Sequence, residues 1–329
     1  MRRRDFIKAL AASSAAWPRL VHAQQAARMR RAGVLMNTAA DNAEAQLGVK
    51  SFQEVLQQSG WSEERDLHFD VRWGENDIDR ERRFASELVA LAPDVLLASG
   101  TVSVTSLQHV THTVPIVFVQ VSDPVGAGVI DTLARPGGNT TGFMNFEYSL
   151  SGKWLELLKQ IAPHVRQVAV IRNPANPAAI AQFSAIQALA QSLGAEVRPI
   201  NVRDANALQH TITELAQSGN GGLIVTPSAG ESVVRDQIVA LAAEYKLPAV
   251  YSDRFNVIAG GLLAYGPDRI EQFRRAAGYV DRILRGEKPT DLPVQAPIKY
   301  QLVINLKTAR TLGLAIPQSL LAGADEVIE

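Results

Sequence analysis

The sequence contains no cysteine and no long apolar run, and each absence removes a class of protein. Without cysteine, this 329-residue chain has no disulfide, no thiolate metal site, no cysteine nucleophile and no lipid-bearing N-terminal cysteine. Without a run of 18 apolar residues, no membrane-spanning helix is expected. Hydrophobic residues make up 47% and charged residues 20%, which excludes disordered and fibrous classes. The length predicts two domains.

A glycine-rich loop follows one apolar strand, but it lacks the features of a nucleotide-binding loop. Gly126 and Gly128 form a Gly-x-Gly, yet the sixth position is Asp131, where glycine or alanine is needed for close helix packing. Pro124 separates the loop from the strand. The motif also needs an acidic residue about 20 residues further on, at the end of a second strand, but Glu147 is in a loop-like stretch. We therefore expect no dinucleotide here, and no cofactor is predicted.

Motifs of the common enzyme classes are also missing. The sequence has no phosphate-binding P-loop and no His-Glu-x-x-His, and the stretch that begins at Thr226 has threonine where a nucleophile elbow needs glycine. His109 and His112 are spaced for one helix face, but no third ligand is nearby, so a solvated helix end is favoured over a metal site. The protein is therefore predicted not to be an enzyme, and no metal is predicted.

The N-terminus has the pattern of an export signal. Basic residues at 2–8 precede a short apolar stretch at 9–16, and Val21-His22-Ala23 has small residues at the positions that a signal peptidase reads. The Arg3-Arg4-Asp5-Phe6-Ile7-Lys8 stretch is similar to the twin-arginine export pattern. Cleavage near Ala23 would leave a soluble protein in the bacterial periplasm, with residues 1–23 as the signal peptide.

The export signal changes the charge of the chain. The full sequence has 33 basic and 33 acidic residues, and removal of the first 23 leaves 28 and 32, a formal balance of −4. A mildly acidic exported protein without a basic stripe is not expected to bind nucleic acid.

Apolar strand patterns alternate with amphipathic helix patterns along the rest of the chain. This alternation predicts an α/β protein with parallel sheets that carry helices on both faces. The predicted strands cover residues 31–37, 67–73, 94–98, 115–121, 167–172, 196–202, 222–226, 248–251, 260–265 and 300–305. The predicted helices cover residues 43–59, 79–91, 102–109, 152–161, 178–193, 205–217, 231–245, 268–284 and 306–312.

Two halves of the chain repeat one pattern, which indicates two similar lobes. An apolar strand, a helix and a second strand that ends in Ser122-Asp123 have a counterpart that ends in Ser252-Asp253. The last 75 residues or so are few for an independent core, so we expect this tail to cross back and complete both lobes.

Polar residues recur at the carboxyl ends of the predicted strands, where open parallel sheets bind ligands. Hydroxyls and free helix N-terminal N–H groups suit a carboxylate, and an aspartate such as Asp123 or Asp253 suits an ammonium group. Each residue could also be only a helix cap, so the set is stronger evidence than any member. The set comprises Asn37, Thr38, Ser99, Gly100, Thr101, Ser122, Asp123, Asn173, Thr226, Ser228, Ser252 and Asp253.

Three stretches resemble ABC transporter substrate-binding proteins of the TrpX-like group. They are SDPVGAGVIDTLARPGGNTTGF at 122–143, the string from GGLLAYGPDRI to LGLAIP at 260–317, and the closing ADEVIE at 324–329. The resemblance extends from about Arg31 to Glu329. It implies a type I periplasmic-binding-protein fold, in which two doubly wound parallel-sheet lobes are joined by three crossovers and close over a small solute.

The resemblance also implies domain boundaries and a site. Lobe I is expected to comprise residues 24–144 and 254–296, and lobe II residues 145–253 and 297–329. Within 122–143, residues 126–133 are expected to form a turn and short helix, and residues 140–143 to approach the first crossover. The implied ligand contacts are Asn37, Thr101, Ser122, Asp123, Asn173, Thr226, Ser252 and Asp253, with Tyr251 and Tyr265 as aromatic walls.

These expectations define a function together with its alternatives. The chain is expected to be the monomeric solute-binding component of an ABC importer, which delivers a carboxylate-bearing, amino-acid-like or aromatic solute to a permease and ATPase in the inner membrane. A periplasmic sensor that partners a membrane receptor stays open, and so does an enzyme that acts on a small molecule. A transcription-factor effector domain would need a DNA-binding motif where the export signal stands.

Overall fold

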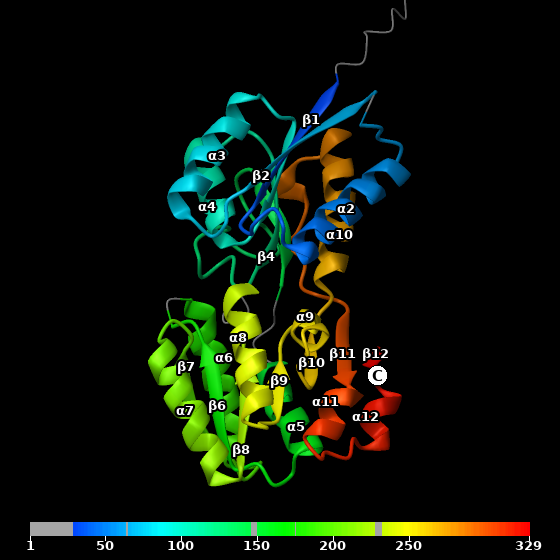
Figure 1. Ribbon diagram of the computed structural model, residues 1–329. Coiled ribbons are helices and arrows are strands. Elements are labelled where there is room, and N and C mark those ends of the chain that lie inside the picture. Colours follow the sequence, from blue (N-terminus) through cyan, green and yellow to red (C-terminus); the bar gives the residue numbers. More distant parts are fainter. Residues whose placement is uncertain (1–28, 64, 146–149, 175, 228–231) are drawn as a thin grey trace, which may run out of the picture.

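The chain folds into two α/β lobes that lie one above the other (Figure 1). The computed structural model describes residues 29–63, 65–145, 150–174, 176–227 and 232–329. The predicted signal peptide, residues 1–23, lies outside the described residues. In the described part of the chain, no helix combines the length and the apolar character that a membrane crossing requires.

Lobe I is built on a five-stranded parallel sheet with the order β2-β1-β3-β4-β5. Its strands are β1 (Arg30–Met36), β2 (Leu67–Trp73), β3 (Val95–Ser99), β4 (Ile116–Val121) and β5 (Thr140–Met144). Its helices are α2 (Ala43–Gln58), α3 (Ile78–Ala90), α4 (Thr101–Val110), α10 (Arg269–Leu284) and the short η3 (Pro289–Asp291).

Lobe II is built on a seven-stranded sheet with the order β12-β11-β10-β9-β8-β6-β7, in which only the β10–β11 pair is antiparallel. Its strands are β6 (Gln167–Arg172), β7 (Glu196–Asn201), β8 (Gly221–Val225), β9 (Ala249–Tyr251), β10 (Leu263–Pro267), β11 (Tyr300–Asn305) and β12 (Glu326–Ile328). Its helices are α5 (Ser151–Ile161), α6 (Pro177–Ala190), α7 (Ala205–Ser218), α8 (Ser232–Glu244), α9 (Arg254–Ile258), α11 (Leu306–Thr311) and α12 (Gln318–Ala322).

The chain passes between the lobes three times: after β5, between β10 and α10, and before β11. The expected boundary at residue 254 is wrong, because β10 pairs with β9 and β11 inside the lobe II sheet. Residues 254–267 therefore belong to lobe II, and the return to lobe I comes at α10, which packs beside α2 (Figure 1). The strand pattern at 260–265 was recognised, but sequence alone did not indicate which sheet it joins.

Asp268 links the second and third crossovers. One oxygen of its carboxylate, Oδ1, accepts the N–H groups of Ile270 and Glu271 at 3.1 and 3.0 Å and so caps α10. The other, Oδ2, accepts Lys299 Nζ and Gln301 Nε2, both at 3.1 Å. The backbone N–H of Asp268 also donates to the Lys299 carbonyl at 3.0 Å. The two connections thus run beside each other as a bonded pair.

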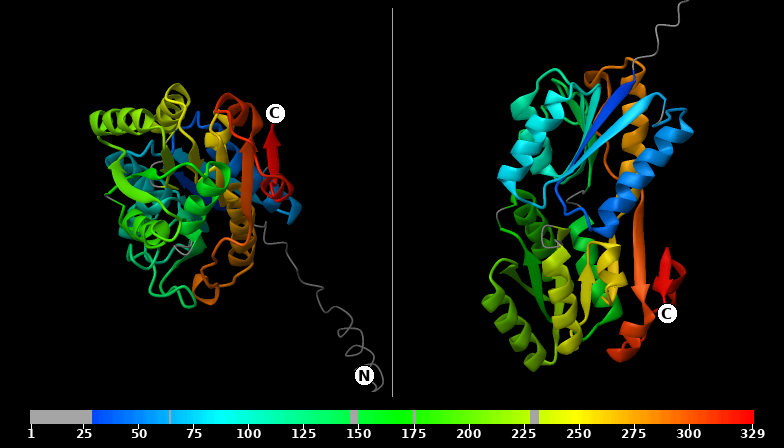
Figure 2. Two further views of the ribbon diagram at one scale, coloured as in Figure 1. Left: turned by 90° about the horizontal axis from the view of Figure 1, so that it is seen from below. Right: turned by 45° about the horizontal axis from the view of Figure 1, so that its top comes forward.

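Each sheet is covered by helices on both faces, because successive strand side chains point to opposite sides. In β1, Val34 and Met36 pack with α2 and α10, whereas Leu35, between them, packs with α3 and α4. Lobe II repeats this arrangement, with α5, α6, α11 and α12 on one face and α7, α8 and α9 on the other. The two sheet-and-helix stacks are visible in the turned view of Figure 2.

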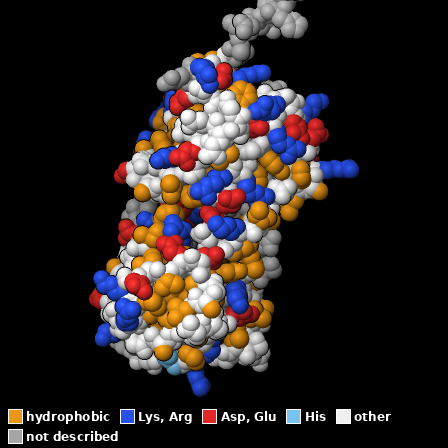
Figure 3. Space-filling view, turned by 90° about the vertical axis from the view of Figure 1, so that its right-hand side faces the viewer, with side chains coloured by type: hydrophobic (Ala, Val, Ile, Leu, Met, Phe, Trp, Pro, Cys, Tyr) orange, Lys and Arg blue, Asp and Glu red, His pale blue; other side chains and the backbone are white. Residues whose placement is uncertain are grey.

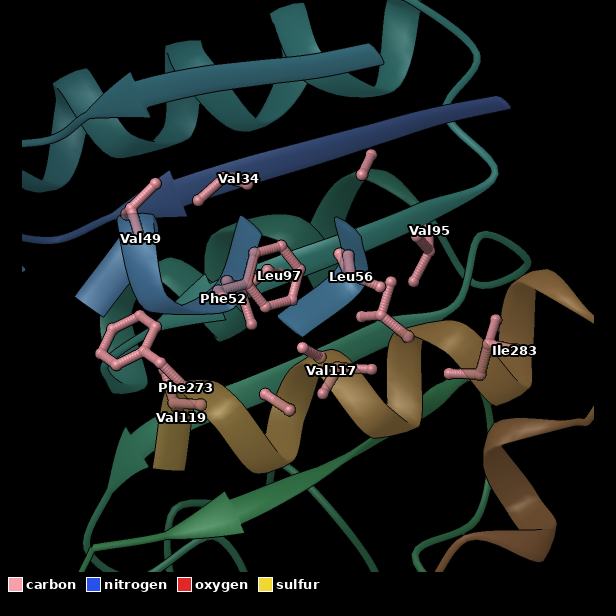
Figure 4. Close-up of a cluster of buried hydrophobic side chains, with 14 of the residues drawn as sticks. Val34, Val49, Phe52, Leu56, Val95, Leu97, Val117, Val119, Phe273 and Ile283 are labelled. Atoms are coloured by element: carbon pink, nitrogen blue, oxygen red, sulfur yellow. The ribbon is translucent and has the colours of Figure 1, made fainter. Parts of the chain in front are cut away.

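The α2–α10 contact forms the centre of one lobe I core (Figure 4). Phe52 and Leu56 of α2 are fully buried, and the ring of Phe52 meets Phe69 of β2 edge-on at 6.1 Å between centroids. Gly48 allows the close approach of the helices, because a Cβ there would lie 2.7 Å from the Phe273 ring of α10.

Most predicted strands and long helices are present within a few residues of their expected bounds, and the two-lobed α/β class is confirmed. The expected short helix at 126–133 is wrong: these residues form turns, in which Gly126 N–H donates to Asp123 Oδ1 at 2.8 Å. Residues 140–143 form most of β5, a full member of the sheet. The pattern reading missed α9, α12 and β12, which are only three to five residues long.

The buried core of lobe I yields a stability prediction. Replacing Phe52 by alanine removes a fully buried ring and leaves a cavity between α2 and the sheet, so the free energy of unfolding should fall by about 3–5 kcal/mol. Urea titration followed by circular dichroism measures this loss. Leu47→Ala is the matched control, because Leu47 lies on the same helix but is 43% exposed, and a comparable loss there would contradict the assignment of the core.

Candidate ligand-binding cleft

A cleft of about 430 Å³ separates the lobes at the carboxyl ends of their strands. Its lobe I wall follows β1, β3 and β4, and its lobe II wall includes the ends of β6 and β8 and the first turn of α8. Most of the lining residues are polar, and many of them have amide side chains. The polar lining residues are Asn37, Thr38, Asn42, Glu44, Glu75, Asn76, Ser99, Thr101, Gln120, Ser122, Asn145, Asn173, Asn176, Arg235 and Arg269.

The N-terminus of α4 faces the cleft from lobe I. Gly100, its N-cap residue, has φ +86° and a backbone that a side chain would strain, and a Cβ there would meet Asn37 Nδ2 at 2.8 Å. No side chain of the described residues caps this helix, and Gly100, Thr101 and Val102 all line the cleft. Free N–H groups at a helix N-terminus favour an anionic group.

Arg269, the first residue of α10, joins three groups at the base of the cleft. Its guanidinium lies 2.8 Å from Glu44 Oε1 of α2 and 2.7 Å from Asp253 Oδ2, and its Nε donates to Gln120 Oε1 of β4 at 2.5 Å. Glu44 and Gln120 belong to lobe I, whereas Asp253, the N-cap of α9, belongs to lobe II. Arg269 is therefore an ion-pair bridge between the lobes.

Glu44 is the acid of this network whose pKa departs clearly from its ordinary value. Burial raises its pKa from the ordinary 4.5 to about 7; the Asp253 carboxylate adds to the rise, while the cations Arg269 and Arg235 oppose it. The Glu44 side chain is 15% exposed. A carboxyl group at the cleft base is thus poised to exchange its proton near neutral pH.

Arg235 is the cationic side chain that α8 contributes to the cleft. Its side chain is 19% exposed, and its Nε lies 3.1 Å from Asp236, an exposed neighbour on the same helix. Arg235 is close enough to Glu44 to act on its pKa. The cleft thus has a helix N-terminus on the lobe I wall and a guanidinium on the lobe II wall, both of which attract anions.

The structure brings four of the ten sequence-predicted site residues to the main cleft and two more to a small cavity beside it. Asn37, Thr101 and Ser122 line the cleft on lobe I, and Asn173 lines it on lobe II. Ser252 and Asp253 line a small cavity that shares Arg269 with the lining of the main cleft. Their contacts with a solute remain predictions.

Four other predicted site residues do not line the cleft. Tyr251 is wrong as an aromatic wall, because it is fully buried in the lobe II core, and burial raises its pKa. Tyr265 stacks on Tyr300 at 5.9 Å, away from the cleft lining. Thr226 is fully buried and donates to the Ile171 carbonyl at 3.0 Å. Asp123 accepts Gly126 N–H, so its role here is to fix a turn.

Sequence reasoning missed Glu44, Arg235 and Arg269, which carry most of the charge of the cleft. All three lie in the first turn of a helix: α2, α8 and α10, respectively. Glu44 and Arg235 could have been found from the sequence, because each lies in the first turn of a helix that follows the end of a strand. No comparable signal marks Arg269, because its place in the cleft depends on where the second crossover enters lobe I.

The remaining candidate was the histidine pair. His109 Nδ1 lies 2.6 Å from the Thr105 carbonyl within α4, and the helix ends one residue later. Among the residues that the structure describes, no group of three or more His, Cys, Asp or Glu side chains could hold a metal ion.

The raised pKa of Glu44 predicts a pH dependence of stability. Between pH 4.5 and about 7 the folded protein keeps a proton that the unfolded chain releases, so stability falls as pH rises through this range, by on the order of 3 kcal/mol in full. Glu44→Gln removes this titration, so the variant should gain stability relative to the wild type from pH 5 to pH 8 in urea titrations. Glu54→Gln, an exposed site on α2, is the control; parallel curves for wild type and Glu44→Gln would contradict the prediction.

Comparisons with known proteins agree with this architecture. The sequence profile of the family "ABC transporter substrate binding protein" matches residues 40–328. A tyrosine-binding protein of Clostridioides difficile (strain R20291) is 26% identical over 266 residues, which cover 80% of this chain and 76% of that protein.

Two solved structures have a similar fold. The ABC domain from Streptococcus pneumonia in complex with L-Trp has a TM-score of 0.81 and 25% identity, over 91% of this chain and all of that one. A conserved domain protein from Vibrio cholerae O1 biovar eltor str. N16961 has a TM-score of 0.82 and 26% identity, with the same coverage.

The family match spans far more than half of the chain and confirms the resemblance that the sequence indicated. It identifies a protein that binds a substrate and does not transform it. The chain belongs to the ABC transporter substrate-binding protein family and has the type I periplasmic-binding-protein fold.

Proposed function

We propose that this protein is the periplasmic solute-binding component of an ABC importer and that its solute is a small amino-acid-like or aromatic molecule with a carboxylate. The observation that carries the proposal is the pairing of anion-binding features across the cleft. The uncapped N-terminus of α4 belongs to lobe I, and Arg235 belongs to lobe II.

A carboxylate between these features would contact both lobes. Contact with both lobes is what a solute needs in order to shift the equilibrium toward a closed state, because binding to one lobe alone favours neither arrangement. The permease would then recognise the closed form. The ion-pair bridge at Arg269 lies at the base of the cleft, so the lobes can rotate about it while the mouth opens.

The solute class is supported by two relatives. One is named for tyrosine binding, and the solved Streptococcus structure holds L-Trp. Both molecules carry a carboxylate and an ammonium group, and the cleft here offers cationic and anionic groups for both. The volume of about 430 Å³ is within the range of small-molecule sites.

The location and partners of the protein rest on the sequence. The basic start, the apolar stretch and the Val21-His22-Ala23 site support export to the periplasm. The family supports an ABC permease and ATPase as partners. On the face seen in Figure 3, basic and acidic side chains are interspersed over both lobes, a surface unlike that of nucleic-acid-binding proteins.

A periplasmic ligand sensor that partners a membrane receptor is the second candidate. Such a sensor would use the same cleft and the same closure, so the distinction lies in the cell and not in the site. Uptake of the radiolabelled solute by a strain that lacks the gene separates the two functions, since loss of uptake is expected for an importer component and normal uptake for a sensor.

Identification of the solute tests the proposal directly. Mass spectrometry of the molecule released on denaturation of the purified protein, followed by a thermal-shift screen of amino acids and aromatic acids, should yield a carboxylate-bearing compound that is returned unchanged. A released compound without a carboxylate would overturn the proposed solute class, and conversion of the added compound to a product would indicate an enzyme.

The Arg235 side chain provides the matching mutational test. Arg235→Ala should weaken binding of the carboxylate solute by roughly tenfold to a hundredfold, because it removes a charge-assisted hydrogen bond in a half-buried site. Isothermal titration calorimetry measures the change. Arg198→Ala, which removes an exposed arginine paired with Glu214 in lobe II, serves as the control, and equal affinities for all three proteins would exclude Arg235 from the site.

A further inference from the structure

The ion-pair bridge at the cleft base has two acids for one base. Arg269 lies 2.8 Å from Glu44 Oε1 and 2.7 Å from Asp253 Oδ2, and its third partner, Gln120, is neutral. The side chains of both acids are 15% exposed, so solvent screens them only in part. With both acids ionised this group has a net charge of −1, and a proton on one of them removes the repulsion between the two.

The hydrogen bonds of the two acids differ. Both oxygens of Asp253 accept a bond, Oδ1 from the N–H of Phe255 at 3.0 Å and Oδ2 from Arg269. Glu44 accepts from Arg269 at Oε1, and its Oε2 has no hydrogen bond within the described part of the chain. A proton on Glu44 Oε2 therefore disturbs fewer bonds than a proton on Asp253.

The charged groups that face Glu44 come from three other elements. They are Arg269 of α10, Asp253 at the start of α9, and Arg235 of α8. The two arginines keep their charge throughout the pH range of a folded protein. The described residues that line the cleft include no histidine, lysine or tyrosine, and burial raises the pKa of Glu44 to about 7. Glu44 is thus the group of this network whose protonation changes near neutral pH.

A solute carboxylate between α4 and Arg235 would change the charge that Glu44 faces. Arg235 is one of the two cations that oppose protonation of Glu44, and an anion paired with it offsets its positive field. The solute also enters the space that Glu44 lines, where its negative charge repels an ionised carboxylate and its bulk displaces water. All three effects favour the neutral form of Glu44.

We propose that the protein takes up a proton at Glu44 when it binds its carboxylate solute. This coupling rests on the proposed function, because it needs an anion beside Arg235. In the free cleft Glu44 is partly ionised near pH 7, and in the complex its carboxyl group carries a proton that comes from the solvent. The solute does not supply the proton, because a carboxylic acid with a pKa of about 4 is ionised at this pH.

Proton uptake and affinity are reciprocal, so the solute should bind more tightly at low pH. If Glu44 is a tenfold weaker acid in the complex than in the free protein, the affinity at pH 5.5 should exceed that at pH 8.5 by roughly fivefold to tenfold. The same difference in acid strength corresponds to uptake of roughly half a proton per solute at pH 7.5.

The first experiment counts the protons in the wild-type protein. L-Tyrosine, L-tryptophan and their desamino acids, 3-(4-hydroxyphenyl)propionate and 3-(indol-3-yl)propionate, are titrated by calorimetry at pH 7.5 in PIPES, HEPES and Tris. These buffers differ in their enthalpy of ionisation, so the slope of the observed enthalpy against that quantity gives the number of protons taken up. A positive slope is expected for each compound that binds. A slope of zero, or the negative slope of proton release, would overturn the inference.

The second experiment tests the assignment to Glu44. Glu44→Gln keeps the size of the side chain but cannot titrate, so its buffer slope should be zero and its affinity should be constant from pH 5.5 to pH 8.5. At pH 8.5 it should bind more tightly than the wild type, because it resembles the protonated form. A purely structural role would instead lower the affinity of the variant at every pH. Proton uptake that persists in Glu44→Gln would show that another group takes the proton.

A second acid of the cleft lining provides the matched control. Glu75 pairs with Arg80 at 2.7 Å, and its side chain is 44% exposed. Glu75→Gln should therefore retain the proton uptake of the wild type, and its loss there would contradict the assignment to Glu44. If a carboxylate-bearing compound binds without proton uptake, this inference fails while the proposed function stands. If none of the four compounds binds to the wild type, both fail.

Discussion

The guanidinium of Arg269 is the group on which the geometry of the cleft depends. It holds the Glu44 carboxylate of one lobe and the Asp253 carboxylate of the other within 2.8 Å, at the point where the chain enters α10. Burial is the main cause of the raised pKa of Glu44, and the Asp253 carboxylate on the other side of the same cation adds to it. The ion pairs between the lobes and the proton equilibrium of Glu44 therefore meet at one residue.

The cleft itself follows from the direction of the strands. Parallel strands in both lobes end at the same gap, so short polar segments after β1, β3, β4 and β6 converge there without any single catalytic motif. This is why the sequence shows a set of hydroxyl and amide residues and no nucleophile or metal-ligand spacing. In such a site, the positions of the helix ends and charged side chains around the cleft determine which solute binds.

The sequence predicted the α/β class, the long elements and the polar strand ends, because hydrophobic periodicity and strand-end chemistry are local properties. It failed where the answer depended on how distant segments meet. Tyr251 follows Val250 in a strand buried on both faces, so each side chain enters a core and neither reaches the cleft. Arg269 became a bridge only because β10 remained in lobe II, a choice of sheet partner that no local pattern reveals.

Asp268 has a consequence for how the lobes can move. Because its carboxylate bonds both to α10 and to Lys299 and Gln301, two of the three interlobe connections are joined into one strap. A link between two connections limits how far they can move independently of each other, which removes some of the motions by which one lobe could shift against the other. Fewer modes of motion mean less entropy to lose on closure, so more of the binding free energy of a solute is retained as affinity.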